Sequence, residues 1–183
     1  MRIIAGAWRG RNLASPGDTT IRPTSDKVRG AIFNIIQHSG YPIEETTRVL
    51  DGFCGSGALG LEALSHGAAF ALFIDSNTAS LQLAKDNATA FKAQKQCGFE
   101  MRDLVKPQTW RAEPFNLVFL DPPYRKSLPG LALSILTEGG FIAQNALAVV
   151  ETARGEDFPI PSKWKALDQR SWGETAAHFL LYA

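Results

Sequence analysis

The sequence predicts an α/β protein with a doubly wound, mostly parallel sheet of seven strands whose last strand is antiparallel. Two observations carry this prediction. Short apolar runs alternate with helical stretches through the middle of the chain, which is typical of βαβ units and of a parallel sheet covered by helices on both faces. At the end, strand-like runs at residues 166–171 and 176–182 are separated only by Trp172, Gly173 and Glu174, which predicts an antiparallel hairpin.

The first 40 residues are expected to form an extension ahead of the main domain, which spans residues 41–183. Residues 3–13 (IIAGAWRGRNL) contain two short apolar runs around glycines and predict a small hairpin. Thr24 or Ser25 can then cap a helix that ends before Gly40 and Pro42. Its apolar positions follow the i, i+3, i+4 spacing: Val28, Ala31, Ile32, Ile35 and Ile36.

The main domain continues with the βα alternation. We expect strands at residues 48–51, 70–75, 98–102, 115–120 and 147–151, and helices near residues 58–66, 77–95 and 131–136. With 183 residues, 45% of them hydrophobic, the chain is long enough for one full core and too short for two ordinary domains.

Charge is distributed unevenly along the chain. The net charge of +1 points to no particular partner. Six basic and two acidic residues give residues 1–30 a charge of +4, and 13 basic and 16 acidic residues give the remainder −3. This asymmetry predicts a local anion-binding face, although a solvated basic surface without a ligand would have the same composition.

Several classes of protein are disfavoured. No stretch approaches 18 uncharged apolar residues, so neither export nor a membrane span is expected and a cytoplasmic location is favoured. Cys54 and Cys97 are too few for a disulfide scaffold, and the three histidines show no pattern of metal ligands. We expect no metal and a monomer.

The glycine-rich stretch DGFCGSGALG, residues 51–60, fits the G-x-G-x-x-G spacing of a nucleotide-binding loop. An aspartate precedes it, and four predicted strands end in or run directly into an aspartate: Asp51, Asp75, Asp103 and Asp121. A carboxylate before the loop would repel the pyrophosphate of NAD, whereas S-adenosylmethionine carries a positive sulfonium and ammonium and no phosphate. The pattern therefore favours S-adenosylmethionine, the other interpretation being that each aspartate only starts a turn or caps a helix.

The stretch DPPY, Asp121 to Tyr124, directly follows the apolar run FNLVFL. Two consecutive prolines fix two φ angles and remove two backbone donors, which makes a rigid, polar corner at the mouth of the sheet. A base amino group is a poor nucleophile and must be held in line with the methyl carbon. The Asp121 carboxylate and the Pro122 carbonyl can accept its hydrogens, and the Tyr124 ring can stack on the base.

These stretches together resemble one family. IIAGAWRGRNL, RPTSDKVRGAIFNII, LDGFCGSGALGLEALSHGA and DPPY are similar to the RsmD family of small-subunit (16S) ribosomal RNA guanine-N2 methyltransferases, which belong to the class I S-adenosylmethionine-dependent, Rossmann-like methyltransferases. The similarity spans nearly the whole chain. It implies catalytic roles for Asp121, Pro122, Pro123 and Tyr124; cofactor contacts for Asp51, Phe53, Cys54, Gly55, Gly57, Asp75, Ser76, Asp103 and Leu104; and RNA contacts for Arg9, Arg11, Arg22, Lys27 and Arg29.

One residue departs from the pattern of the family. Gly30 stands where members usually have glutamate, so the contact made by that glutamate is absent here. A glycine inside a helix also destabilises it by roughly 1 kcal/mol relative to alanine.

Other activities remain open at this level. DPPY also occurs in enzymes that methylate adenine N6 in DNA or a protein amide, but duplex-reading enzymes need recognition elements for which this chain has little length. A target base must leave its stack, which is easiest in an RNA loop, and a basic segment can supply phosphate contacts. An NAD-dependent oxidoreductase is disfavoured by Asp51 ahead of the glycines, and an inert binding module by the intact DPPY.

Overall fold

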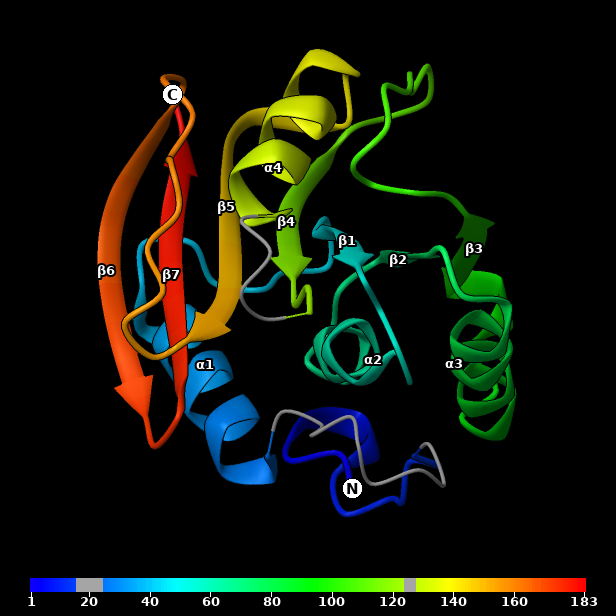
Figure 1. The fold of residues 1–183 in the computed structure, drawn as a ribbon. Coiled ribbons are helices and arrows are strands. Elements are labelled where there is room, and N and C mark those ends of the chain that lie inside the picture. Colours follow the sequence, from blue (N-terminus) through cyan, green and yellow to red (C-terminus); the bar gives the residue numbers. More distant parts are fainter. Residues whose placement is uncertain (16–24, 124–127) are drawn as a thin grey trace.

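The computed structural model of the chain describes residues 1–15, 25–123 and 128–183. Within these residues seven strands form one sheet in the order β3-β2-β1-β4-β5-β7-β6 (Figure 1). All neighbouring strands from β3 to β5 are parallel, whereas β7 runs antiparallel to both β5 and β6. The strands are β1 (Arg48–Gly52), β2 (Phe70–Asp75), β3 (Cys97–Met101), β4 (Phe115–Leu120), β5 (Ile142–Ala153), β6 (Trp164–Trp172) and β7 (Thr175–Tyr182).

Helices cover both faces of the sheet. Figure 1 shows α1, α2 and α3 on one face and α4 on the other. Two hydrophobic clusters match these faces, one centred on Phe73, Phe119 and Phe33 and the other on Leu120, Phe141 and Leu133. The helices are α1 (Asp26–His38), α2 (Ala58–Ser65), α3 (Thr78–Ala90) and α4 (Leu128–Glu138). The predicted fold class, including the antiparallel last strand, is confirmed.

Most predicted elements are found within two residues of their expected ends, and three are not. The predicted helix 77–95 is wrong beyond Ala90, because Lys92 adopts a left-handed conformation with φ of 59° and the chain then makes a 3-10 turn before β3. β5 begins at Ile142 rather than at 147. Its pairing with β4 shifts register between Phe115 and Leu117, so the first part of β5 does not continue the regular pattern of the part that was predicted. α4 is also longer than predicted.

The N-terminal segment forms a compact loop on the outer side of α2. The expected hairpin is reduced to a single antiparallel bridge between Arg2 and Asn12, with a 3-10 turn at Gly6–Trp8. Ile3 and Leu13 are buried in the same cluster as the helices of that face. Ser25 then caps α1, its hydroxyl accepting a hydrogen bond from the Val28 N–H at 3.2 Å, and Thr24 lies outside the described residues.

The strand order creates a switch point beside β1. The chain passes from β1 outward to β2 and β3, and then returns to β4 on the opposite side of β1. In open α/β sheets ligands bind at such a point, outside the carboxyl ends of the strands. Among the described helices, none is long and apolar enough to span a membrane.

Candidate active site

The glycine loop lies at the carboxyl end of β1, at the switch point. Phe53, Gly55 and Gly57 have φ angles of 59°, 52° and 75°, all in the left-handed region. The Cys54 N–H donates to the Ile74 carbonyl at 3.1 Å, which ties the loop to β2, and the Gly57 N–H donates to the Cys54 carbonyl at 2.7 Å. The loop thus turns sharply from β1 into the start of α2.

Gly60 allows α2 to approach the sheet closely. A Cβ at this position would lie 2.5 Å from Cε1 of the buried Phe73 ring and 3.1 Å from Oδ2 of Asp51. The Gly60 N–H donates to that same Asp51 oxygen at 2.8 Å. The last glycine of the motif is therefore needed for helix-to-strand packing, and its backbone holds the carboxylate of β1.

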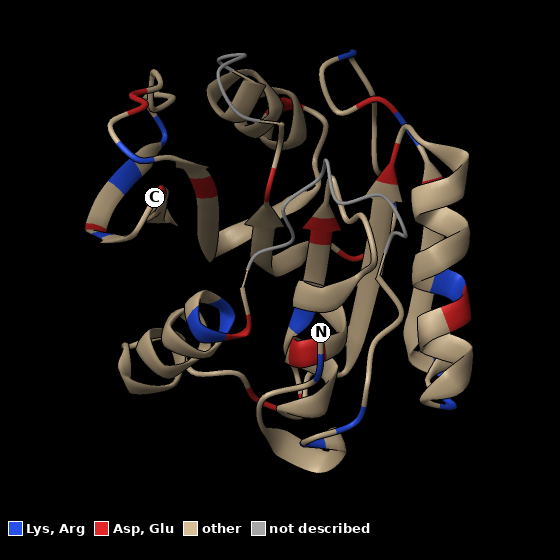
Figure 2. Cartoon of the chain, turned by 60° about the horizontal axis from the view of Figure 1, so that its bottom comes forward, with Lys and Arg blue, Asp and Glu red and all other residues tan. Residues whose placement is uncertain are grey.

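Asp51 is a buried acid without a basic partner among its recorded contacts. It is 1% exposed, and burial raises the pKa of its carboxyl well above the ordinary value of 3.8; the hydrogen bond from Gly60 acts in the opposite direction. The negative charges of Asp121 and Asp75 raise this pKa further. Three carboxylates from β1, β2 and β4 therefore gather at one edge of the sheet, and Figure 2 shows acidic residues at the ends of neighbouring central strands.

Asp75 joins the loop to the end of β2. One carboxylate oxygen accepts from the Gly55 N–H at 3.0 Å and the other from the Asn77 N–H at 2.8 Å. Asp103 is further along the edge, where it accepts from the Val105 N–H at 3.2 Å and lies 3.5 Å from the Lys106 ammonium. Both carboxylates keep lone pairs available for hydroxyl or amino donors.

The DPPY stretch begins at the end of β4. The Asp121 N–H donates to the Gly52 carbonyl at 3.4 Å, which extends the pairing of β4 with β1 by one residue. Asp121 is partly exposed, Pro122 is buried and Pro123 is exposed, and Tyr124 lies outside the described residues. The acid and the first proline are therefore fixed directly beside the glycine loop.

The remaining residues predicted to contact the cofactor differ in their exposure to solvent. Phe53, Gly55 and Ser76 are accessible at the edge, whereas Gly57 is buried. Leu104 is 1% exposed, and its side chain packs in the core beside Gly52. Burial, followed by the charges of Asp51 and Asp75, raises the pKa of the Cys54 thiol, which therefore stays protonated and unreactive.

The structure contradicts the predicted RNA contact of Arg29. Its side chain is fully buried, with Nε 3.3 Å from Oε2 of Glu62 and Nη2 2.9 Å from Oδ1 of Asp26, and Nη2 also donates to the Arg2 carbonyl. A buried guanidinium paired in this way cannot reach a phosphate. The count of positive charges in residues 1–30 misleads here because one of them is used inside the fold.

Glu62, on α2, completes this buried cluster. Its carboxylate accepts from the N–H groups of Ile4 and Ala5 at 2.9–3.0 Å, and its Oε1 lies 3.5 Å from Nε2 of His66. The neighbouring Ser65 hydroxyl accepts from the Trp8 N–H at 3.0 Å. The N-terminal segment is therefore held on α2 by hydrogen bonds that sequence inspection missed, although a lone glutamate in the apolar helix ALGLEALS is a signal that could have drawn attention to it.

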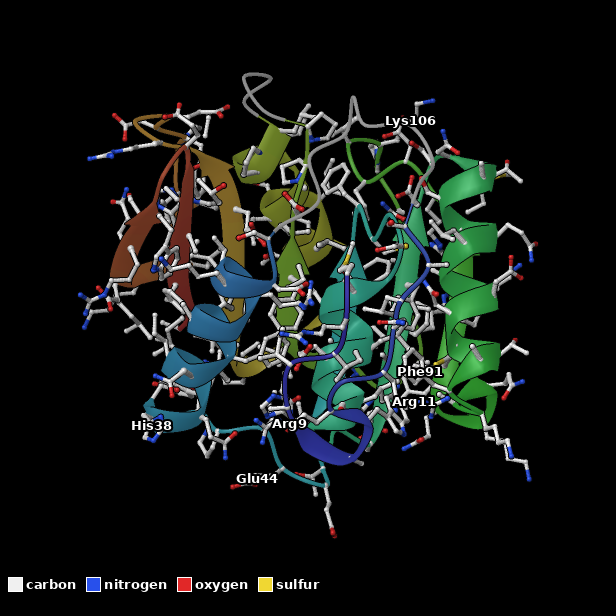
Figure 3. All side chains as sticks on the ribbon, turned by 90° about the horizontal axis from the view of Figure 1, so that it is seen from below. Arg9, Arg11, His38, Glu44, Phe91 and Lys106 are labelled. Atoms are coloured by element: carbon white, nitrogen blue, oxygen red, sulfur yellow. The ribbon has the colours of Figure 1, made fainter. Side chains whose placement is uncertain are left out.

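The other residues predicted to contact RNA are exposed where the structure describes them. Arg9, Arg11 and Lys27 are exposed, and Arg22 lies outside the described residues. The Arg11 guanidinium lies over the Phe91 ring, 4.3 Å from its centroid, and donates to the Ala90 carbonyl at 2.6 Å. Figure 3 shows Arg9, Arg11 and Phe91 at one end of this face and Lys106, near the acidic edge, at the other.

A cleft of about 200 Å³ lies near the amino ends of β4 and β1, away from the acidic edge. Its lining includes Tyr41, Thr47, Asn116 and Asn145 and none of the predicted site residues. Among the described residues, no three His, Cys, Asp or Glu side chains gather as metal ligands would. The acidic edge at the switch point is therefore the candidate active site, on the grounds of its chemistry.

Comparisons with known proteins identify the family of the chain. The family described as "Conserved hypothetical protein 95" matches residues 1–181. The chain is 39% identical over 180 residues to "Ribosomal RNA small subunit methyltransferase D" of Escherichia coli (strain K12), covering 96% of this chain and 87% of the relative.

Two solved structures share the fold. "Putative methyltransferase yhhF from Escherichia coli" superposes with a TM-score of 0.82 and 34% identity, covering 100% of this chain and 97% of the other. An RNA methyltransferase from Salinibacter ruber in complex with S-adenosyl-L-homocysteine has a TM-score of 0.67 and 18% identity, covering 87% and 93%. The second similarity bears on the fold alone.

Proposed function

Since the chain belongs to the RsmD family, described as "Conserved hypothetical protein 95", we propose that it transfers a methyl group from S-adenosylmethionine to the exocyclic N2 of a guanine in small-subunit (16S) ribosomal RNA. The relatives named for small-subunit rRNA methylation support the substrate class. The guanine and its N2 position are inferred from the resemblance of the motifs. Such an enzyme is expected to act in the cytoplasm as a monomer.

The observation that carries the proposal is the convergence of Asp51, Asp75 and Asp121 at the switch point. Their mutual repulsion, together with the burial of Asp51, suits a ligand that brings positive charge. A pyrophosphate would meet the same three carboxylates and be repelled, which argues against NAD. The relatives that are named as methyltransferases support a cofactor that donates a methyl group.

Each residue at the acidic edge would contact the part of the cofactor that lies nearest to it. Asp51 and the loop from Phe53 to Gly57 would hold the methionine part of the cofactor, Asp75 its ribose, and Ser76 and Asp103 the adenine side. When bound, S-adenosylmethionine supplies an electrophilic methyl group.

Asp121 and the Pro122 carbonyl would accept the two hydrogens of the guanine amino group and so direct its lone pair toward that methyl group. As the new N–C bond forms, the C–S bond breaks and its electrons stay on sulfur. The methylated, positively charged amino group would then pass one proton to the Asp121 carboxylate, which returns it to water. Pro123 keeps the corner rigid, and Tyr124 is proposed to stack on the base.

The N-terminal extension, residues 1–40, would face the RNA, and residues 41–183 would form the methyltransferase domain. Arg9, Arg11 and Lys27 are exposed, and none of them forms an ion pair with a carboxylate of the described residues, so each is suited to phosphate contact. Arg22 is kept as a contact from its sequence position. Arg9 and Arg11 lie at the other end of this face from the acidic edge. RNA that contacts these arginines and also places its base at the acidic edge would therefore extend along the whole N-terminal segment.

The deciding experiment is transfer of radiolabelled methyl from S-adenosylmethionine to small-subunit particles that lack their native modifications, followed by nucleoside analysis. We expect label in N2-methylguanosine. Label in N6-methyladenosine of DNA, or in a protein amide, would instead support the other DPPY-type activities. Binding of NAD in preference to S-adenosylmethionine in calorimetry would contradict the electrostatic basis of the proposal.

Two substitutions separate the roles of the acids. Asp121→Ala is expected to lower turnover by roughly 10²–10³-fold with nearly unchanged cofactor affinity, because its carboxylate orients only the amino group. Asp75→Ala is expected to weaken cofactor binding by about 1–3 kcal/mol, through the loss of a charged hydrogen-bond partner. The reverse pattern would mean that the two roles are exchanged.

A further inference from the structure

Asn87, on α3, connects the glycine loop to the N-terminal segment. Its Nδ2 donates to the carbonyls of Ser56 at 2.9 Å and Ala14 at 3.0 Å, and its Oδ1 accepts from the Ala14 N–H at 2.9 Å. The residue is 3% exposed. One buried amide therefore joins three segments that lie 31 and 73 residues apart in the chain.

The chemistry of this junction requires an asparagine. Two of the three partners are carbonyls, which only accept, and the third is an N–H, which only donates, so the orientation of the amide is fixed by its partners. Both amide hydrogens are used. Aspartate would place an oxygen against two carbonyl oxygens, and alanine would leave all three groups without this partner.

The two ends of the junction lead to the two proposed ligand sites. Ser56 lies between Gly55 and Gly57 in the cofactor loop, and the Gly55 N–H is bound by Asp75. Ala14 belongs to the basic segment 1–30, and the Leu13 N–H beside it donates to the Met1 carbonyl at 3.0 Å. Both ends of this N-terminal loop therefore lie close to the cofactor loop.

We infer that Asn87 is a positioning residue that couples RNA binding by the N-terminal segment to cofactor binding by the glycine loop. The inference rests on the proposed function. RNA bound to the N-terminal segment keeps the hydrogen bonds between Ala14 and Asn87 formed. The Asn87 amide, fixed in this way, holds the Ser56 carbonyl, so the glycine loop is ordered before the cofactor binds. By thermodynamic reciprocity the cofactor strengthens RNA binding by the same factor.

The test measures the dissociation constant of S-adenosylhomocysteine by calorimetry, alone and with small-subunit particles lacking their native modifications. For the unaltered protein we expect affinity to rise about fivefold or more in the presence of particles. Ala14→Pro removes the N–H on the side of the segment and leaves the Ser56 bond in place. It should bind S-adenosylhomocysteine alone within about twofold of the unaltered protein and lose the rise, as a coupling role requires.

Asn87→Ala should lose the rise and also bind S-adenosylhomocysteine more weakly alone. The matched control is Asn116→Ala, whose amide also accepts one backbone N–H from another segment, that of Arg48 at 2.8 Å, but lies away from the acidic edge. It should keep the full rise. If Asn87→Ala does not fold, Ala14→Pro decides alone: loss of the rise supports the inference, and an unchanged rise overturns it.

An unchanged rise in both Ala14→Pro and Asn87→Ala would overturn the inference. So would the absence of any rise in a protein that methylates the particles, and in that case the proposed function would stand. Particles that neither bind nor accept methyl groups would overturn the proposed function and the coupling together.

Discussion

Asp51 and Glu62 are two buried carboxylates on opposite sides of α2, and their pKa values are shifted in opposite directions. Asp51 is 1% exposed and Glu62 is 0% exposed. Burial raises the pKa of Asp51, and nearby acids raise it further. Burial also acts to raise the pKa of Glu62, but the His66 ring at 3.5 Å, the hydrogen bonds from the Ile4 and Ala5 N–H groups and the charge of Arg29 outweigh it, so this pKa is lowered.

The difference shows that burial alone does not define a functional acid. Glu62 has its counter-charge and its donors within the fold, and it holds the N-terminal segment on α2. Asp51 has one donor, Gly60, and two acidic neighbours. A carboxylate that has no positive partner among the described residues is suited to a ligand that brings one.

The largest change in the free energy of unfolding should come from removing the charge of Glu62, the acid that has its counter-charge within the fold. Glu62→Gln leaves Arg29 buried with only the partly exposed Asp26 as an ionic partner, so we expect the free energy of unfolding to fall by about 3–5 kcal/mol. Urea denaturation measures this change.

The matched control is Glu113→Gln, which loses an ion pair with Arg48 at 3.5 Å in which Glu113 is 72% exposed. We expect a change below about 1 kcal/mol there. Equal losses at the two positions would mean that the Glu62 cluster contributes no more than a surface pair.

Gly60→Ala should give the next largest effect, on the side of Asp51. The new Cβ would approach the buried Phe73 ring at 2.5 Å, so either the ring or α2 must move, which overpacking data place at about 1–3 kcal/mol of stability. Gly40→Ala, where nothing lies within 4 Å, is the control for adding a methyl group. A neutral Gly60→Ala would show that α2 can shift freely over β2.

Asp51→Asn should separate binding from stability. We expect cofactor affinity to weaken by about 1–3 kcal/mol, because a charged partner for the ligand is lost, while the free energy of unfolding stays within about 1 kcal/mol or rises. Calorimetry and urea denaturation measure the two quantities. Asp86→Asn, at an exposed acid on α3, should change neither. Loss of stability without loss of affinity would make Asp51 a structural acid like Glu62.

The smallest effects should appear in the pH dependence of stability, measured as differences between each variant and the unaltered protein. Because the pKa of Glu62 is lowered from 4.5, its stabilisation is present above that pH and is lost as pH falls through the lower folded pKa. Because the pKa of Asp51 is raised from 3.8, the unaltered protein loses stability relative to Asp51→Asn as pH rises from 3.8 through the folded pKa. Parallel pH profiles for the two variants would remove the contrast between the acids.

Much of the fold was accessible from the sequence because local patterns determine it. β2 and β4 begin and end where predicted, since each contains four consecutive buried apolar residues. The end of α3 was missed because the left-handed conformation of Lys92 has no signal in the residue itself. The acidic edge was predictable, because the carboxyl ends of parallel strands share one side of a sheet.

The contacts that hold the N-terminal segment were not predictable in this way. Arg29 meets Glu62 across 33 residues, and Asn87 meets Ala14 across 73, and no local spacing records either pair. The family resemblance and the excess of basic residues in this segment therefore pointed Arg29 to RNA, although its partner Glu62 lies inside the fold. Long-range pairing of polar residues is decided by tertiary packing, which the sequence pattern does not report.

The position of β7 also sets the order in which the sheet can be completed during synthesis. β7 follows β6 in the chain, yet it lies between β5 and β6. Until Thr175–Tyr182 has left the ribosome, β6 has no neighbour in the sheet and the edge of β5 stays open. The parallel half from β3 to β4 can assemble as it emerges, whereas the other half must wait for the final strand and depends until then on protection from aggregation.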